Sequence, residues 1–264
     1  MMVKDSLKIL SVGNSFAEDT SWHLADVAQS LGFEGVKIGF LYIGGCSINR
    51  HYNNALNDLA DYVYFENTGS GWSKTEGKRI SEAVASDEWD YISIQHGTGD
   101  GSRYTLPASY ENLEALIAYI KELAPKKAKI AFNMAWVMES HSTHPEICSY
   151  NGDQMLMYRN LVELTSTVVR GAKGLDIVSP AGTAVQNARE TEARDKLCRD
   201  GFHLSFELGR YIASLTFLKA LTGVDVDNVS WKPDGVTDLE QRIAILSADR
   251  AILSPFAISS MKDI

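Results

Sequence analysis

The sequence contains few cysteines, and they do not form a recognisable set. Its three cysteines, Cys46, Cys148 and Cys198, are odd in number and widely spaced, which fits neither a disulfide framework nor a zinc site. His141 and His144 lie close together but have only nearby glutamates as partners, so we interpret HSTHPE as a solvated loop. We therefore expect reduced thiols and no bound metal.

Positive charge is also scarce. Lysine and arginine number 25 against 34 acidic residues, which gives a formal net charge of −9. Nucleic acids and anionic membranes would require clustered cations, so we expect neither as a partner. A small or carbohydrate-linked polar substrate suits this charge better, and the sequence does not indicate an oligomeric state.

Long apolar segments are missing as well. No run of 18 apolar residues occurs, and the N-terminal MMVKDSLKILSVG lacks the apolar core of a signal peptide. As given, the chain reads as cytoplasmic, although a leader could have been removed. No repeat, low-complexity tract or Pro/Gly-rich linker interrupts it. We therefore expect residues 1–264 to form one domain.

Apolar runs of strand length alternate with helical patterns. Runs that are apolar on both faces predict parallel strands buried between helices; they cover residues 7–12, 36–43, 91–94, 129–136 and 176–178. Apolar spacing of i, i+3, i+4 and i+7 predicts core-facing helices around residues 24–31 and 208–215. The pattern predicts an α/β fold, a flavodoxin-like three-layer α/β/α sandwich with about five parallel strands.

One segment departs from this alternation. DYVYFENTGSGWSKTEGK, residues 61–78, alternates apolar and polar residues around Gly69-Ser70-Gly71. This pattern predicts an inserted β-hairpin before the third strand of the parallel set. We expect the hairpin to form a flap beside the functional site.

The first predicted strand ends in Gly13-Asn14-Ser15 at the start of a helical pattern. Ligands of doubly wound sheets bind at the carboxyl ends of the strands. A serine there directs its backbone N–H and the positive end of the helix at the group that it attacks. A simple helix-capping turn is the alternative, since Asn and Ser are favoured caps.

A second signal precedes the last long helical pattern. Two residues separate Asp200 from His203 in CRDGFHLSFELGRY, so a short turn can place the carboxylate against one imidazole nitrogen. The other nitrogen can then face the sheet edge and act on a nucleophile. Together with Ser15, the pair predicts a nucleophilic triad.

These blocks resemble the SGNH (GDSL-like) hydrolase superfamily in order and cover nearly the whole chain. The resemblance rests on Gly13-Asn14-Ser15, Gly44-Gly45, Gln95 and Asp200-x-x-His203. The segments GNSF, IGGCSINRHY, WDYISIQ and DGFHLS are in particular similar to the bacterial DUF4886 family. The resemblance is specific for the SGNH hydrolase fold and says little about substrate.

The resemblance implies a role for each matching residue. Ser15 would be the nucleophile, His203 the general base and then acid, and Asp200 the group that fixes the imidazole tautomer. The oxyanion hole would consist of the backbone N–H groups of Ser15 and Gly45 and the side-chain amide of Gln95. The chain departs from the family pattern in having Asn14 for the usual Asp and Gln95 for the usual Asn.

Several further residues are candidate substrate contacts. They are Asn14, His51, His96, Arg103 and Tyr104. Gln95 and His96 are consecutive and would face opposite sides of a strand, and the last two belong to HGTGDGSRY, which we interpret as a flexible loop at the site. That loop lacks the signature of a phosphate- or dinucleotide-binding motif, so we expect no cofactor. Cys46 is a rival nucleophile in principle, but without a base its predicted role is packing.

The sequence thus predicts a serine esterase that removes a short acyl group through an acyl-enzyme. The superfamily's repertoire favours an acetyl ester on a carbohydrate. A lysophospholipase or a thioesterase is the alternative within the enzyme class. A catalytically weak sugar-binding protein that retains the fold is the alternative outside it, and Asn14 and Gln95 are the residues that would indicate it.

Overall fold

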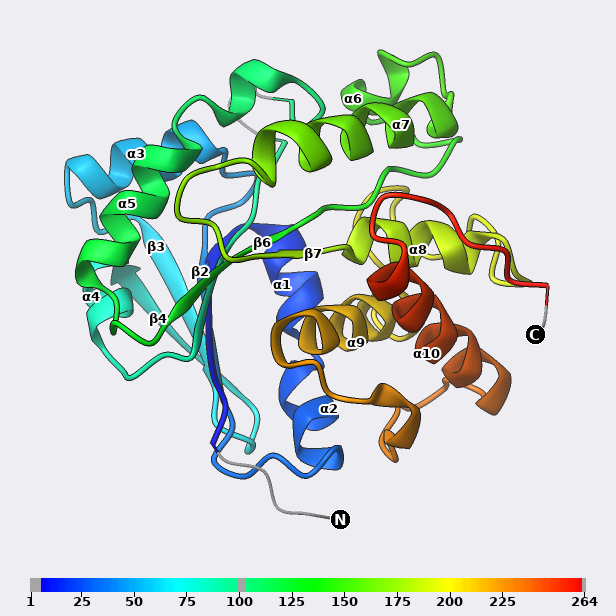
Figure 1. Ribbon diagram of the computed structural model, residues 1–264, viewed down its shortest axis with the longest axis horizontal. Helices are drawn as coiled ribbons and strands as arrows, with labels where there is room; N and C mark the ends of the chain where they lie inside the picture. The colour runs from blue at the N-terminus through cyan, green and yellow to red at the C-terminus, as the bar shows by residue number, and fades with distance from the viewer. Residues whose placement is uncertain (1–5, 99–102, 263–264) are drawn as a thin grey trace.

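In the structure, a computed structural model that describes residues 6–98 and 103–262, seven strands form one sheet in the order β4-β3-β2-β1-β5-β6-β7 (Figure 1). The strands are β1 (Lys8–Gly13), β2 (Lys37–Tyr42), β3 (Tyr62–Asn67), β4 (Trp72–Lys78), β5 (Tyr91–Ile94), β6 (Lys129–Asn133) and β7 (Ile177–Ser179). Strands β2, β1, β5, β6 and β7 are mutually parallel. The five predicted parallel strands are therefore confirmed.

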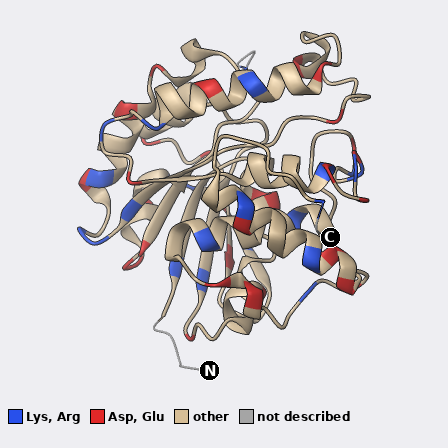
Figure 2. Ribbon diagram, turned by 45° about the vertical axis from the view of Figure 1, so that its right-hand side comes forward, with Lys and Arg blue, Asp and Glu red and all other residues tan. Residues whose placement is uncertain are grey.

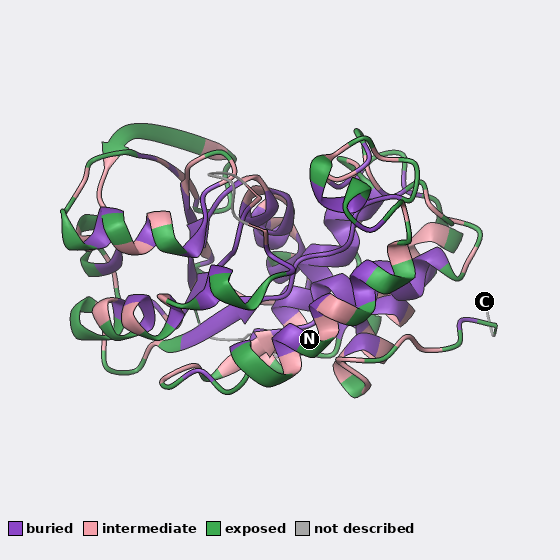
Figure 3. Ribbon diagram, turned by 90° about the horizontal axis from the view of Figure 1, so that it is seen from above, coloured by how far each residue is buried: buried purple, intermediate pink, exposed green. Residues whose placement is uncertain are grey.

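The parallel strands are buried on both faces because consecutive side chains point to opposite sides. In β1, Ile9 joins one apolar cluster while Leu10 and Val12 join the other. Helices cover both sides of the sheet (Figures 1 and 3), and the buried residues gather along the strands and the helix faces turned toward them. This arrangement is the predicted three-layer α/β/α sandwich.

The two helical layers differ in size. One apolar cluster is covered by α3 (Ile48–Leu56), α4 (Ile80–Ala85) and α5 (Leu113–Leu123). The other is covered by α1 (Ser15–Ser21), α2 (Leu24–Ser30), α7 (Gln154–Leu164), α8 (Ala181–Arg189), α9 (Leu208–Thr222) and α10 (Asp238–Leu253). Shorter elements are α6 (Pro145–Cys148), η1 (Pro107–Tyr110), η2 (Thr165–Val169) and η3 (Val226–Asn228).

The two helices predicted from apolar spacing are confirmed as α2 and α9. Helix α9 ends at Thr222. Its C-cap, Gly223, donates its N–H to the carbonyl of Lys219 at 2.8 Å and then turns the chain away with a left-handed φ of 70°. Glycine adopts this conformation without steric cost, which explains the stop at this residue. Helix α9 packs beside α1 (Figure 1), so it brings the segment before it to the start of α1.

The hairpin of residues 61–78 exists, but the expected flap does not. Strand β3 pairs antiparallel with β2, and β4 pairs antiparallel with β3, so the hairpin extends the sheet. The open edge of β2 offers backbone hydrogen bonds, and Phe65 stacks on Phe40 with ring centroids 4.7 Å apart. These contacts hold the hairpin in the sheet plane.

Charged residues of both signs are interspersed over the helices and the sheet edges (Figure 2). None of the helices in the described part of the chain is both long and apolar enough to cross a membrane.

Candidate active site

The turn after β1 is tight and leads directly into α1. Asn14 caps the helix: its Oδ1 accepts a hydrogen bond from the backbone N–H of Phe16 at 2.9 Å. A Cβ on Gly13 would lie 2.5 Å from the Cβ of Ala17, so only glycine allows the strand to approach the helix this closely. Ser15 is thereby fixed as the first residue of α1, partly exposed at the carboxyl edge of the sheet.

Ser15, His203 and Asp200 form one hydrogen-bonded chain. The Oγ of Ser15 lies 2.8 Å from Nε2 of His203, and Nδ1 of His203 lies 2.6 Å from Oδ2 of Asp200. The short distance to the carboxylate favours a proton on Nδ1, which leaves Nε2 as the acceptor for the serine hydroxyl. The three residues predicted to form a triad therefore meet, although 185 residues separate Ser15 from Asp200 in the chain.

A narrow turn presents Asp200 and His203. Its two arms are joined by hydrogen bonds from Arg199 N to the His203 carbonyl at 2.8 Å and from Ser205 N to the Leu197 carbonyl at 2.7 Å. Within the turn, Oδ1 of Asp200 accepts the backbone N–H of His203 at 2.8 Å. This local network orders the carboxylate before any substrate binds.

The environment of Asp200 keeps it ionised. Burial alone would raise the pKa of its carboxyl, but hydrogen bonds from the His203 side chain and from the backbone N–H groups of His203 and Phe202 outweigh burial and lower that pKa. A carboxylate that stays charged stabilises the imidazolium that forms when His203 takes a proton.

A buried carboxylate that the sequence analysis did not single out holds the turn against α1. Oδ1 of Asp19 accepts from Arg199 Nη1 at 2.9 Å and from Arg210 Nε at 2.7 Å, and its Oδ2 accepts from Leu204 N at 2.9 Å. Asp19 lies one helical turn after Ser15, and Leu204 is the neighbour of His203. We call Asp19, Arg199, Arg210 and the Leu204 N–H the Asp19 cluster. The sequence contains one signal for this role, because Asp19 is an acidic residue on the side of α1 that is buried.

Three loops converge beside Ser15. Nδ2 of Asn14 donates to the Cys46 carbonyl at 3.1 Å, which ties the β1 turn to the β2 loop. Gly45 has a left-handed φ of 64°, and a Cβ on Gly97 would lie 2.6 Å from both the Gly45 carbonyl carbon and the Cys46 oxygen. The β2 and β5 loops can touch only because both positions are glycines.

The side chain of Gln95 is buried at this junction. Its Oε1 accepts from Asn133 Nδ2 at 3.0 Å. Its Nε2 makes no hydrogen bond to any residue that the structure describes. A buried amide donor without a partner is costly.

Four of the five candidate substrate contacts, Asn14, His51, His96 and Tyr104, are buried side chains that make contacts within the protein. Asn14 is occupied by the two backbone hydrogen bonds described above. His51 is fully enclosed; its Nδ1 lies 2.8 Å from the Tyr62 hydroxyl, and burial lowers its pKa to about 3. Cys46 contacts the same imidazole at 3.4 Å and is a buried packing residue, as predicted.

His96 and Tyr104 are buried on the other side of the β5 loop. Burial lowers the pKa of His96 to about 4, and its ring lies 5.0 Å from that of Tyr110. The hydroxyl of Tyr104 donates to the Trp136 carbonyl at 2.9 Å. Tightly packed aromatic neighbours explain why neither faces solvent.

Arg103 retains partial exposure, but its guanidinium is engaged. It donates to the Ser149 hydroxyl and lies 5.5 Å from the centre of the Tyr150 ring. The prediction that HGTGDGSRY, residues 96–104, is a flexible loop falls in part on residues 99–102, which lie outside the described residues.

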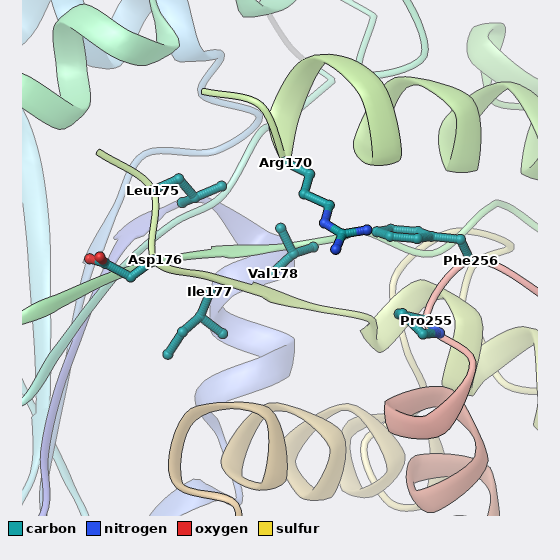
Figure 4. Close-up of a pocket in the computed structure, with 7 residues that line it drawn as sticks. All are labelled: Arg170, Leu175, Asp176, Ile177, Val178, Pro255 and Phe256. Carbon is teal, nitrogen blue, oxygen red and sulfur yellow. The ribbon is translucent and has the colours of Figure 1, made fainter. Parts of the chain in front are cut away.

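A hollow of about 250 Å³ lies at the edge strand β7 and is not lined by Ser15 (Figure 4). It is lined by Arg170, Leu175, Asp176, Ile177, Val178, Pro255 and Phe256. Its lining contains neither a serine, a cysteine nor a histidine, so it offers no nucleophile and base. Among the described residues, no group of three His, Cys, Asp or Glu side chains is arranged to hold a metal ion.

The seven-stranded sheet with helices on both faces is a fold shared with GDSL-like hydrolases, and Ser15, His203 and Asp200 meet at the carboxyl edge of its central strand. The chain belongs to the DUF4886 family: the model of that family, described as a domain of unknown function, matches residues 8–251. A DUF4886 family protein from Bacteroides uniformis is similar at 30% identity over 98% of this chain and 99% of that chain, with a TM-score of 0.92.

More distant structures share the fold. Axe2, an acetylxylan esterase from Geobacillus stearothermophilus, is 15% identical over 84% of this chain and 97% of that chain, with a TM-score of 0.51. A member of the lipolytic protein G-D-S-L family from Veillonella parvula is 14% identical over 84% of this chain and 100% of that chain, with a TM-score of 0.50. No curated protein matches the chain.

Proposed function

We propose that this protein is a serine esterase that hydrolyses a short acyl ester, an acetyl group first of all, on a carbohydrate. The observation that carries the proposal is the hydrogen-bonded chain from Ser15 Oγ through His203 to Asp200, with distances of 2.8 and 2.6 Å. A binding protein would have no need for a nucleophile, a base and an orienting carboxylate in this order.

In the acylation step, Ser15 Oγ attacks the ester carbonyl carbon while Nε2 of His203 accepts the hydroxyl proton. The carbonyl oxygen becomes an oxyanion, and Asp200 stabilises the imidazolium through Nδ1–H. When the tetrahedral intermediate collapses, the bond to the alcohol oxygen breaks and His203 returns its proton to that oxygen. The alcohol leaves, and the acyl group remains on Ser15.

Three donors are available for the oxyanion. They are the backbone N–H groups of Ser15 and Gly45 and the Nε2 of Gln95. The unpartnered state of Nε2 among the described residues supports its place in this set. Each such donor stabilises the transition state because it is oriented before charge develops.

In the deacylation step, His203 removes a proton from water, and the resulting oxygen attacks the acyl carbon. Collapse of the second tetrahedral intermediate breaks the bond to Ser15 Oγ, which regains its proton from His203. The products are a carboxylic acid and the free enzyme.

The proposed substrate class is supported by the similarity of the fold to an esterase structure and by the net charge of the chain. The fold is shared with the acetylxylan esterase Axe2, and the net charge of −9 favours a neutral substrate over an acidic one. Lysophospholipase and thioesterase activities are the competing assignments for the same triad.

The first test is labelling with a fluorophosphonate probe, which reacts with activated serines. We expect the wild-type protein to label and Ser15→Ala to remain unlabelled, and Ser11→Ala, which changes a buried serine of β1, is the control. Failure of the wild type to label, or equal labelling of Ser15→Ala, would refute the proposed triad.

The second test is a panel of acetyl, butyryl and octanoyl esters together with acetylated xylan. We expect kcat/KM to be highest for acetyl esters and acetylated xylan to be deacetylated. Preference for octanoyl esters would instead support a lipid substrate.

A further inference from the structure

An exposed aromatic side chain follows His203 in the chain. Phe206 is three residues after His203 and is 54% exposed, although most large aromatic side chains of this fold are buried. The backbone carbonyl of Phe206 accepts a hydrogen bond from the His23 ring at 2.7 Å, which fixes the segment that carries it. Phe206 is thus held in an exposed position in the segment that follows His203.

Two guanidinium groups support the ring. The guanidinium carbons of Arg199 and Arg210 lie 4.8 and 4.9 Å from its centroid. Both arginines donate to the same oxygen of Asp19, and Arg210 is buried. The two guanidinium groups are therefore held in place by the protein, and the ring packs against them. Stacking on cations that are themselves fixed makes the ring a rigid surface for a ligand.

Polar groups border this ring on the side of the nucleophile. Glu18 is three residues after Ser15 in α1, so the two side chains are neighbours on the helix surface. Its carboxylate lies 3.3 Å from Arg210 Nη2, and its side chain remains 25% exposed. The Arg199 side chain is 24% exposed. We call Phe206, Arg199, Arg210 and Glu18 the Phe206 ledge.

Negative charge slightly exceeds positive charge in this region. Glu18 and Asp19 offset Arg199 and Arg210, and the exposed Glu207 next to Phe206 adds one negative charge, so the surface does not favour an anion. It combines one exposed apolar ring with a carboxylate that accepts hydrogen bonds and a guanidinium that donates them. A neutral ring compound with an apolar face and several hydroxyl groups matches all three features. A long acyl chain would meet charged groups within one residue of Phe206.

We propose that the Phe206 ledge is the subsite for the alcohol part of the ester, and that it binds a sugar ring stacked on Phe206 with hydroxyls toward Glu18 and Arg199. The inference rests on the proposed esterase function of Ser15. It assigns the sugar-binding surface to the segment after His203 and to the exposed face of α1, away from the buried residues of the β5 loop.

The test compares a sugar ester with an ester of a small alcohol. For methyl xylopyranoside triacetate and ethyl acetate, the ratio of kcat/KM should fall about 5- to 10-fold in Phe206→Ala. Phe206→Trp should keep the wild-type ratio, because it retains an aromatic face. Leu253→Ala, which truncates an exposed apolar side chain at the end of α10, should leave the ratio unchanged.

Binding of the same triacetate to Ser15→Ala, measured by calorimetry, tests the ledge without turnover. We expect Ser15→Ala/Phe206→Ala to bind about 5- to 10-fold more weakly. An unchanged ratio and unchanged binding in the Phe206→Ala proteins would overturn the inference. Phenyl acetate is assayed beside these two esters, and a loss of kcat/KM confined to it would overturn the assignment to sugars. Absence of hydrolysis and of fluorophosphonate labelling in the wild type would refute the esterase itself, while the binding experiment still decides the ledge.

Discussion

Asp19 and Asp195 are both partly or fully buried carboxylates paired with a buried arginine, yet they hold different parts of the chain. Asp195 lies 3.0 Å from Arg189 Nε, accepts the Ser140 N–H at 2.9 Å and accepts Gln154 Nε2 at 3.0 Å. We call these four residues the Asp195 cluster. It joins the loop after β6 to α7 and α8, whereas the Asp19 cluster joins α1 to the turn that carries His203.

The two clusters have similar residue types, so residue type alone does not decide whether a carboxylate cluster positions the candidate catalytic residues. Both clusters combine a guanidinium that forms an ion pair with a backbone N–H that donates a hydrogen bond. In the Asp19 cluster that N–H belongs to Leu204, next to His203, and the carboxylate belongs to the helix that begins with Ser15. The Asp19 cluster therefore sets the separation of nucleophile and base.

The largest expected effect is a loss of kcat in Asp200→Asn, and Asp195→Asn is the variant with which it is compared. We expect Asp200→Asn to lower kcat for acetyl esters about 10⁴-fold, because an amide no longer favours the Nδ1–H tautomer of His203. Asp195→Asn should leave kcat within about 2-fold, since no catalytic group touches it. Steady-state kinetics of both variants measures the contrast, and a similar loss in the two would contradict the assignment of Asp200.

A smaller effect is expected from Asp19→Asn. An amide has one acceptor oxygen and cannot accept from Arg199, Arg210 and Leu204 together, so the His203 turn should shift relative to Ser15. We expect kcat to fall about 100-fold and the free energy of unfolding to fall by about 3 kcal/mol.

Asp195→Asn is the matched control for that variant. It should also lower the free energy of unfolding but should not slow fluorophosphonate labelling. If Asp19→Asn destabilises the protein while its labelling rate at a temperature well below unfolding equals that of the wild type, Asp19 has only a structural role.

The smallest effect is a pH dependence at Glu146, a buried carboxylate outside both clusters. Burial raises its pKa to about 7, and hydrogen bonds from the Thr105 side chain and backbone only partly oppose burial. The unfolded chain releases this proton near pH 4.5, so the free energy of unfolding should fall as pH rises from about 4.5 to 7. The expected total is about 3 kcal/mol.

Glu146→Gln should remove that slope, as urea denaturation at a series of pH values would show. The pKa of Asp195 is shifted in the opposite direction, downward. Burial opposes its ionisation, but hydrogen bonds from Gln154 and Ser140 and the charge of Arg189 lower its pKa. Its stabilisation is therefore lost only at more acidic pH, and Asp195→Asn should leave the slope between pH 4.5 and 7 in place. An equal slope in the wild type and Glu146→Gln would contradict the raised pKa.

Local sequence patterns were sufficient to predict the parallel strands and the residues of the hydrogen-bonded chain at the site. Runs such as residues 7–12 are apolar on both faces, and this alone predicts a strand between two layers. Gly13-Asn14-Ser15 and Asp200-x-x-His203 predicted the residues of the hydrogen-bonded chain, because each motif is a short turn whose geometry is local.

Burial could not be predicted in the same way. His51 and His96 are polar residues near the glycine loops, and their types are typical of a binding pocket. Their enclosure depends on Tyr62 and Tyr110, which come from other elements. The hairpin of residues 61–78 was predicted as a flap for a similar reason, since pairing with β2 is decided by an open strand edge and not by the alternation of its residues.

The sequence by itself determined the elements, the tight glycine turn before Ser15 and the short turn from Asp200 to His203, because these depend on backbone sterics and on contacts within a few residues. Tertiary structure decided which of the polar residues meet. It brought Asp19 under the His203 turn, placed Phe206 in an exposed position beside it and enclosed His51. These outcomes follow from packing between segments far apart in the chain, where volume and unsatisfied hydrogen bonds decide which side chains are buried.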